Sequence, residues 1–186
     1  MLDVEDGSRP LDASVRLERV VRENYPMIWR LARRWGLSPA DADDVTQQAV
    51  VVASRRLAEI TPGAERAFLC RTTLFLASNL RRGERRRAEE AVENWEEIGD
   101  RSRDPEQLLE ERRTRAELDA ILEELPDALR ATFVLFELEL QTQTEVAAAL
   151  QIPAGTVASR VRRAREIVSA SIARRARKNQ RIGALR

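Results

Sequence analysis

The chain has 186 residues, enough for one ordinary domain or two small ones, and its 32 basic and 31 acidic residues nearly cancel. A single cysteine and no histidine exclude an intramolecular disulfide, a thiolate cluster and the commonest metal ligands. The N-terminal residues MLDVEDGSRPLD have neither a basic start nor an apolar centre, and no apolar run approaches the roughly 18 residues of a membrane span. We therefore expect a soluble, cytoplasmic protein with no signal peptide, no membrane insertion, no metal and no cofactor.

Apolar residues recur at helical spacing along most of the chain, and strand patterns are nearly absent. Near the N-terminus they step by three and four residues, in two groups: Leu17, Val20 and Val21, then Ile28, Leu31, Ala32 and Trp35. Pro26 lies between these groups, so we predict that a second helical segment starts there and that Gly36 ends it. The fold class predicted for the chain is all-α.

The next helix is predicted from about Pro39 to Leu57. Ser38 suits its N-cap and Asp41 its positive N-terminal end. Its inward stripe is Ala42, Val45, Ala49, Val52 and Ala53, and its opposite face carries Asp44, Gln47, Gln48 and Val51. An apolar side chain framed by hydrogen-bonding groups indicates a partner surface, although a solvated face with one valine explains the same pattern.

Pro62 and Gly63 break the chain before a helix with the sequence AERAFLCRTTLFLASNLRRGERRR. Cys70 lies in its apolar part and is most simply a small core residue. The acidic stretch that follows is weakly periodic and predicts a linker, although DPEQLLEE within it also suits the start of a helix. The predicted organisation is a tail (1–12), a first domain (13–88), an acidic linker (89–112), a second domain (113–178) and a basic tail (179–186).

Residues 145–165, EVAAALQIPAGTVASRVRRAR, have the spacing of a helix-turn-helix. Pro153 ends the first helix, and Thr156 is predicted to cap or steady the second. Gln151 occupies the turn position where glycine is usual, at a cost of roughly 1 kcal/mol if its φ is positive. The apolar positions of the motif are Val146, Leu150, Ile152, Val157 and Val161.

The second helix of this motif has two contrasting faces. Val157, Val161, Ala164 and Val168 form the predicted buried stripe, and Ser159, Arg162, Arg163 and, at the edge, Arg165 lie opposite. One packed face and one face of donors is the geometry of a DNA recognition helix. An ordinary amphipathic helix with an arginine face is the alternative.

Charge is distributed in opposed blocks. Acidic residues dominate from Glu89 to Glu117, whereas Glu166 is the one acid from Arg160 to the end. This pattern indicates one surface for a polyanion and another that avoids it. Lys178 is the one lysine among the 32 basic residues, and arginine suits phosphate and guanine, although a GC-rich genome explains the bias equally well.

Two motifs together resemble a known family. ADADDVTQQAVV (40–51) is similar to the core-binding segment of the extracytoplasmic-function (ECF) sigma factors, the small two-domain class of the bacterial sigma-70 family. DPEQLLEE…LEELPDALRATFVL…TEVAAALQIPAGTVASRVRRAR resembles their C-terminal domain almost throughout, and the likeness covers about residues 13–178. It implies an adaptor rather than an enzyme: the first domain binds RNA polymerase core (beta and beta-prime subunits) and melts and reads the −10 promoter element, and the second reads the −35 element.

The resemblance also implies residue roles. Polymerase core binding falls to Asp41, Asp44, Gln47, Gln48 and Val51. Contact with −35 promoter DNA falls to Thr156, Ser159, Arg162, Arg163 and Arg165. The loop around Ile60 to Arg66 takes up a flipped-out base, and the −10 single-strand set is Ile60, Arg66, Arg71, Phe75, Asn79, Arg81 and Arg82.

The chain departs from the family pattern where DNA is read. Phe68 occupies the position where the family often has tryptophan. Ala158 occupies a position of the recognition helix where the family often has a basic residue. Phe75 replaces an asparagine unless a small shift lets Asn79 serve, and Gln48 replaces a glutamate of the core-binding motif. We therefore do not transfer the usual promoter consensus.

The resemblance further implies a monomer when free and a sequestering anti-sigma factor as partner. An acidic linker would repel bare DNA and thread a basic polymerase channel, or serve as an ordinary solvated spacer. Two other classes of protein explain less of the sequence. A stand-alone helix-turn-helix regulator leaves ADADDVTQQ and the arginine-rich run 81–87 unexplained, and an enzyme lacks a glycine-rich phosphate loop and any nucleophile–base spacing.

Overall fold

The computed structural model describes residues 8–90 and 105–183, which form seven α-helices and one π-helix with no strand among them. This confirms the predicted all-α class. The remaining segments, which hold much of the predicted N-terminal tail, part of the acidic linker and the end of the basic tail, lie outside the described residues. No helix within 8–90 and 105–183 has the length and apolarity needed to cross a membrane. The helices are α1 (Ser8–Arg34), α2 (Pro39–Arg55), α3 (Glu65–Glu90), α4 (Pro105–Leu122), α5 (Asp127–Phe133), the π-helix η1 (Val134–Leu138), α6 (Gln143–Leu150) and α7 (Ala154–Gly183).

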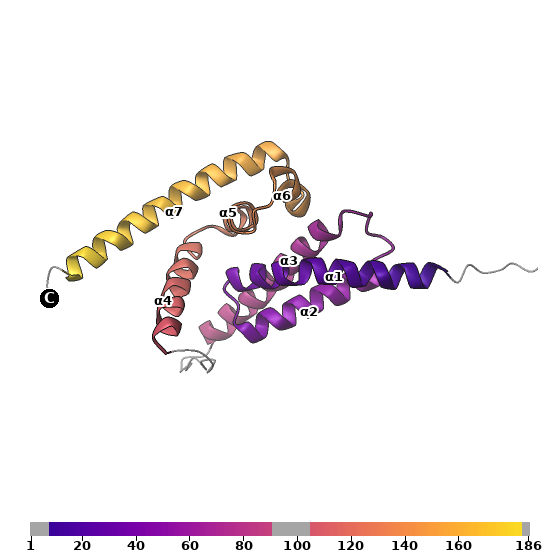
Figure 1. Cartoon of the computed structure of the whole chain (residues 1–186). Coiled ribbons are helices and arrows are strands. Elements are labelled where there is room, and N and C mark those ends of the chain that lie inside the picture. The colour runs from indigo at the N-terminus through magenta and orange to yellow at the C-terminus, as the bar shows by residue number, and fades with distance from the viewer. Residues whose placement is uncertain (1–7, 91–104, 184–186) are drawn as a thin grey trace, which may run out of the picture.

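Helices α1, α2 and α3 pack on one another and form what we call the N-terminal unit (Figure 1). The inward stripe predicted for α2 is buried at four of its five positions, and Val52 is half-buried. Small alanines on this stripe let α2 lie close to its neighbours. The fully buried side chains of the unit include Ile28, Leu31, Ala32, Ala42, Ala49, Cys70 and Ala77.

Helix α1 runs through Pro26 without a break, so the predicted restart of the helix at this residue is wrong. A proline in a helix interior removes one backbone hydrogen bond and costs about 3 kcal/mol. Here Val20 before it and Met27 and Ile28 after it are all buried in the same core. Packing of both flanks against α2 and α3 therefore outweighs the local preference.

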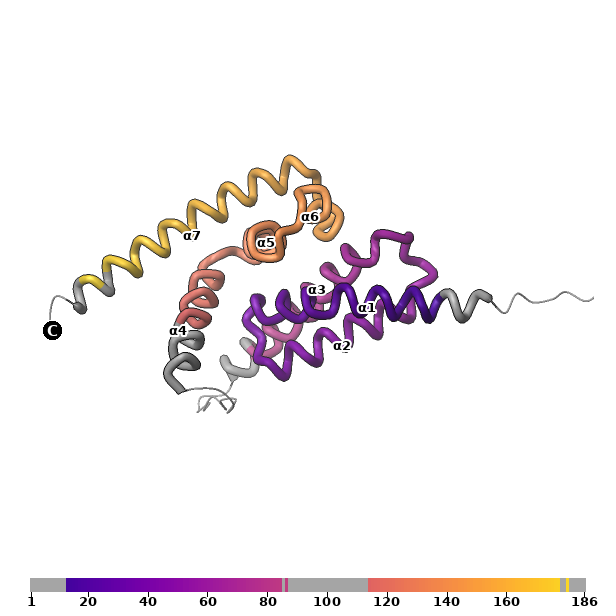
Figure 2. Tube along the Cα trace, viewed as in Figure 1, coloured from indigo at the N-terminus to yellow at the C-terminus, as the bar shows by residue number. Residues whose placement is uncertain are grey.

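Helices α4 to α7 form the C-terminal unit. Figure 2 shows the chain passing from α4 through α5 and α6 into the long α7, which returns past α5 toward α4. Helix α7 packs on all three of these helices. Its Val157, Val161 and Ala164 are buried, as the sequence predicted, and Val168 is half-buried.

The π-helix η1 was not predicted. The Glu139 N–H donates to the Val134 carbonyl at 2.9 Å, five residues back, which widens the last turn. Leu140 follows in a left-handed conformation, with φ 53° and a side chain that is 84% exposed. The sequence FELEL gives no local signal for this wide turn, because its residues suit an ordinary helix.

Candidate polymerase-binding and DNA-binding surfaces

The start of α2 is built as predicted. The Asp41 N–H donates to the Ser38 hydroxyl at 3.1 Å, Pro39 occupies the first turn, and the Ser38 hydroxyl donates to the Asp41 carboxylate. An acidic side chain at a helix N-terminus is also favoured by the helix dipole. Asp41 is thus half-buried and engaged in the cap, rather than on the open face of the helix.

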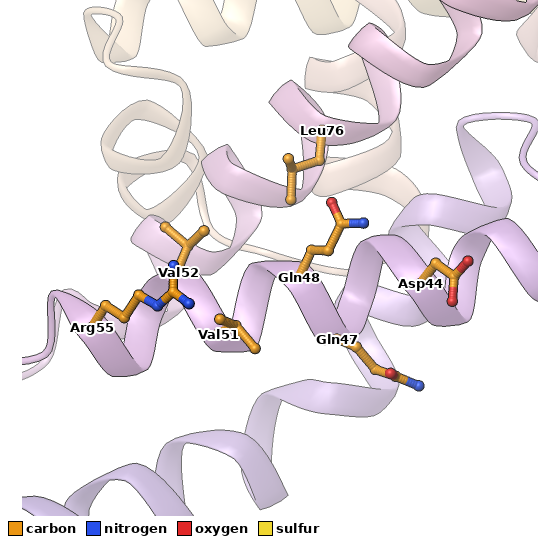
Figure 3. Close-up of a pocket in the computed structure, with 7 residues that line it drawn as sticks. All are labelled: Asp44, Gln47, Gln48, Val51, Val52, Arg55 and Leu76. Atoms are coloured by element: carbon orange, nitrogen blue, oxygen red, sulfur yellow. The ribbon is translucent and has the colours of Figure 1, made fainter.

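The other four residues predicted to bind polymerase lie together on the exposed side of α2. Together with Val52 and Arg55 of α2 and Leu76 of α3, they line a shallow hollow on the protein surface (Figure 3). Val51 is 45% exposed there, although it is apolar. An apolar floor with amide and carboxylate groups around it suits a protein partner. The four residues are Asp44, Gln47, Gln48 and Val51.

The loop between α2 and α3 is fastened to α1 by Arg16, a residue that the sequence did not single out. Its guanidinium donates to the carbonyls of Leu57 at 3.1 Å and Ile60 at 2.6 Å, and it pairs with Glu65 at 2.7 Å. Three contacts from one side chain hold the loop in a defined shape.

Glu65 also organises this loop from the other side. Its carboxylate accepts a hydrogen bond from the Gly63 N–H at 2.6 Å. Burial alone would raise the pKa of Glu65, but hydrogen bonds from its own backbone, from Arg16 and from Gly63 outweigh burial and lower the pKa. The ionised carboxylate therefore stabilises the loop that the family resemblance associates with a flipped-out base.

The predicted single-strand residues are divided between core and surface. Ile60 is only 6% exposed and belongs to the hydrophobic core. Arg66 is exposed and donates to the Asn24 side chain at 3.2 Å. The structure thus presents Arg66, and not the side chain of Ile60, at this end of α3.

Further along α3, aromatic and cationic side chains alternate. Arg71 lies 5.6 Å and Arg56 5.7 Å from the ring centroid of Phe68, which is half-buried. Phe75 is 61% exposed, which is unusual for so large an apolar side chain. Exposed aromatic rings beside arginines are the groups that bind unpaired bases and their phosphates.

The last three residues predicted to contact single-stranded DNA, Asn79, Arg81 and Arg82, all make hydrogen bonds within the protein. Arg82 donates to the Asn79 side chain at 2.7 Å. Arg81 donates to the Trp35 carbonyl at 2.9 Å and pairs with Glu123 of the C-terminal unit at 3.3 Å. Arg81 is therefore engaged within the protein, and Arg82 remains at the surface.

The helix-turn-helix is formed by α6 and α7. Gln151 has φ 54° and ψ 46°, so this turn residue adopts the left-handed conformation that glycine usually supplies. Helix α6 begins with a capping box in which Thr142 and Glu145 bond reciprocally to each other's backbone. The T-x-x-E spacing of TQTE would have revealed it. Thr156 lies inside the first turn of α7, which starts at Ala154, so it is not the cap of this helix.

The outward face of α7 carries the residues predicted to contact −35 DNA. Arg163 pairs with Glu166 at 2.8 Å and Arg165 with Glu137 at 2.6 Å, both at the surface. Arg162 has no ion-pair partner among the residues that the structure describes. Ser159 is exposed, and its hydroxyl donates to the carbonyl of Thr156, whose own side chain is half-buried.

Glu124 anchors the distal part of α7 to the end of α4. The Ser171 hydroxyl donates to its carboxylate at 2.7 Å, and Arg174 and Arg175 pair with it as well. The hydrogen bond from Ser171 lowers the pKa of Glu124, aided by the two arginines. Sequence patterns did not indicate this anchor because Ser171, Arg174 and Arg175 lie 47 or more residues from Glu124 along the chain.

Comparison with known proteins agrees with this geometry. Residues 20–87 match the family model for sigma-70 region 2, and residues 115–168 match that for sigma-70 region 4. The chain is 32% identical over 137 residues to the ECF RNA polymerase sigma-E factor of Escherichia coli, covering 69% of this chain and 72% of that protein. The chain belongs to the ECF sigma factors. An ECF sigma factor of Mycolicibacterium smegmatis, SigE, is 34% identical over 151 residues, covering 80% of this chain but only 58% of that protein.

Solved structures share the fold of this sigma factor. CnrH, solved in complex with the cytosolic domain of CnrY, matches with a TM-score of 0.64 at 25% identity over 84% of this chain and 86% of CnrH. The sigma factor RpoE of Bartonella quintana, solved with the anti-sigma factor NepR, matches with a TM-score of 0.58 at 18% identity over 83% of this chain and 95% of RpoE. The second likeness bears on the fold alone.

Proposed function

We propose that this sigma factor binds RNA polymerase core through the exposed face of α2 and directs the enzyme to promoters. The α3 surface would contact the opened −10 element, and α7 the −35 duplex. The observation that carries the proposal is that one chain presents two separate exposed faces, the hollow of α2 and the arginine face of α7. Each lies opposite a buried apolar stripe that fixes its orientation.

The chemistry of each surface supports its role. Arg162 and Arg163 on a helix backed by Val157 and Val161 offer bidentate donors to guanine edges and phosphates. Phe75 offers a ring on which an unpaired base can stack. Extruding a base from the duplex costs a few kcal/mol, and binding in the polymerase complex must offset this cost. The chain is thus a binding adaptor in the cytoplasm, where polymerase acts.

Comigration with sigma-free core RNA polymerase on gel filtration tests the docking role. We expect stoichiometric comigration of the wild-type chain, which alone elutes as a monomer. Val51→Asp places a charge in the hollow of α2 and should abolish comigration. Val15→Asp changes an equally apolar residue that is 67% exposed on α1 and should leave comigration intact. If the chain does not bind polymerase, elutes as a dimer and retards DNA on a gel without any partner, it is instead a stand-alone regulator.

We also infer an anti-sigma partner. The support is membership of the family, the CnrH structure, which was solved with the cytosolic domain of CnrY bound, and the exposed apolar side chains of α2 and α3 that such a partner can cover. Co-expression of a cognate anti-sigma factor should suppress transcription from the promoters that the chain uses. Full activity in cells that contain the partner gene but no inducing signal contradicts this inference.

A further inference from the structure

The loop between α2 and α3 ends in residues 61–64, which we call the tip and which carry no large side chain. All four residues are exposed, and the Ala64 N–H donates to the Thr61 carbonyl at 2.9 Å, which closes the tip into a turn. Gly63 has φ 90°, and apart from its own chain neighbours no described residue comes within 4 Å of the place where a Cβ atom would stand. A flat ring can therefore approach the backbone of the tip closely.

Below the tip, the loop is held on two sides. The side chains of Leu57 and Ile60 are buried, and their carbonyls both accept hydrogen bonds from Arg16 of α1. Figure 1 shows this loop beside the N-terminal half of α1. Arg16 lies 41 and 44 residues away along the chain, so the shape of the loop depends on a distant residue as well as on its own sequence.

The third contact of Arg16 is with Glu65, the first residue of α3. Their charged groups lie 2.7 Å apart, and their side chains are only 21% and 8% exposed. The Glu65 carboxylate also accepts a hydrogen bond from the Gly63 N–H at 2.6 Å, so one ion pair joins α1, α3 and the tip. Burial of such a pair costs solvation that two apolar side chains would not lose. Apolar side chains, however, would leave the loop carbonyls and the Gly63 N–H without these partners.

We propose that Arg16 is a positioning residue for −10 recognition, which fixes the tip in the shape that accepts one unpaired base of the opened strand. The inference rests on the proposed function, which brings this end of α3 to the opened −10 element. A loop that is ordered before DNA arrives loses less conformational entropy when the base binds, so its fixed shape strengthens binding. Arg16 lies below the tip and acts through it.

Arginine suits this role better than lysine does. Its planar guanidinium directs several N–H groups at once, here to two carbonyls and a carboxylate, whereas the lysine ammonium is a compact charge without this fork. Arg16→Lys keeps a cation beside the buried Glu65 carboxylate, so the chain should fold, but it releases the loop carbonyls. Arg16→Gln removes the charge as well.

The test compares the binding of one DNA strand with and without a base. The full chain is combined with core RNA polymerase, and fluorescence anisotropy measures the affinity of this holoenzyme for a single-stranded oligonucleotide. The oligonucleotide carries the −10 sequence of a promoter found by run-off transcription, and in a series of versions each −10 position in turn is an abasic site. For the wild-type chain, loss of the captured base should weaken binding roughly tenfold, in keeping with the usual strength of one base stack.

Arg16→Lys and Arg16→Gln should bind the intact strand roughly tenfold more weakly than wild type does. They should also no longer distinguish the intact strand from the strand that lacks the captured base. Both variants should still comigrate with core polymerase, because the hollow of α2 does not include the loop. Arg22→Gln is the matched control: it removes an ion pair with Glu18 of the same helix, away from the loop, and it should behave as wild type.

Three results count against the proposal, and they are distinguishable. If the Arg16 variants lose the same factor in affinity on intact and abasic strands, Arg16 only stabilises the fold, and the positioning role is overturned. Full base dependence in both variants overturns it as well. If the wild-type holoenzyme binds every abasic strand as tightly as the intact strand, the −10 part of the proposed function fails, and this inference fails with it. If Arg16→Gln does not fold, Arg16→Lys alone decides between these results.

Discussion

Two residues of the C-terminal unit adopt a conformation that glycine tolerates better. Leu140 and Gln151 have φ of 53° and 54°, and both side chains are exposed. The left-handed conformation costs a residue with a Cβ atom about 1–2 kcal/mol. Because little side-chain packing is lost on replacement, Leu140→Gly and Gln151→Gly should each stabilise the folded protein.

The expected gain follows from two opposing effects. Relief of the left-handed strain favours glycine by about 1–2 kcal/mol, and the greater freedom of glycine in the unfolded chain returns about 0.5–1 kcal/mol. A net gain of roughly 0.5–1 kcal/mol per site raises the melting temperature of a protein of this size by about 1–4 °C. The double variant should gain close to the sum if the two turns are independent.

Thermal unfolding followed by circular dichroism measures this gain. Gln151→Ala is the control, because alanine keeps the Cβ atom and therefore the strain, and it should not raise the melting temperature. Binding of Gln151→Gly to −35 DNA should be unchanged, since the turn geometry is retained. A lower melting temperature for both glycine variants would refute the claim that these turns are strained.

Three further predictions concern the recognition helix, the loop before α3 and the cap of α6. Arg162→Ala should weaken promoter binding and reduce the slope of log affinity against log salt concentration by about one unit. Arg177→Ala, at an exposed residue of the same helix, should leave this slope unchanged. Equal slopes for the two variants count against the assignment of Arg162 to DNA. The pKa of Glu65 is lowered in the folded state, so its stabilisation is present above the usual pKa of a glutamate and disappears as the pH falls through the lowered value. The stability difference between wild type and Glu65→Gln, measured by urea unfolding, should therefore shrink in acid, and a constant difference contradicts the assigned cause. Thr142→Ala should cost about 1 kcal/mol of unfolding free energy through the lost cap, and an unchanged urea midpoint shows that the capping box contributes nothing.

Features set by neighbouring residues were predictable from the sequence. The Ser38 cap, the inward stripe of α2 and the two faces of α7 depend on spacing and side-chain chemistry within a few residues, so periodicity identifies them. The sequence marked Gln151 as the turn position where glycine is usual but left its conformation open, and the structure shows that it is left-handed. The capping box of Thr142 had an equally local signal.

Features set by distant contacts were not predictable. Helix α1 continues through Pro26 because its packing on other helices outweighs the local tendency of proline to interrupt a helix. Arg16 fastens a loop that lies 41 to 49 residues away, and Glu139 reaches Arg30 across 109 residues of chain. No periodic pattern encodes which charged side chains meet when two units dock.

Run-off transcription from a pool of genomic promoter fragments tests the central claim most directly. Core RNA polymerase alone should give no discrete transcripts. Core polymerase with the wild-type chain should give defined start sites that share −35 and −10 sequences, and these should be lost when Arg162 and Arg163 are both replaced by alanine. Absence of new start sites, from a folded chain that comigrates with core polymerase, would contradict its role as a promoter-specificity subunit.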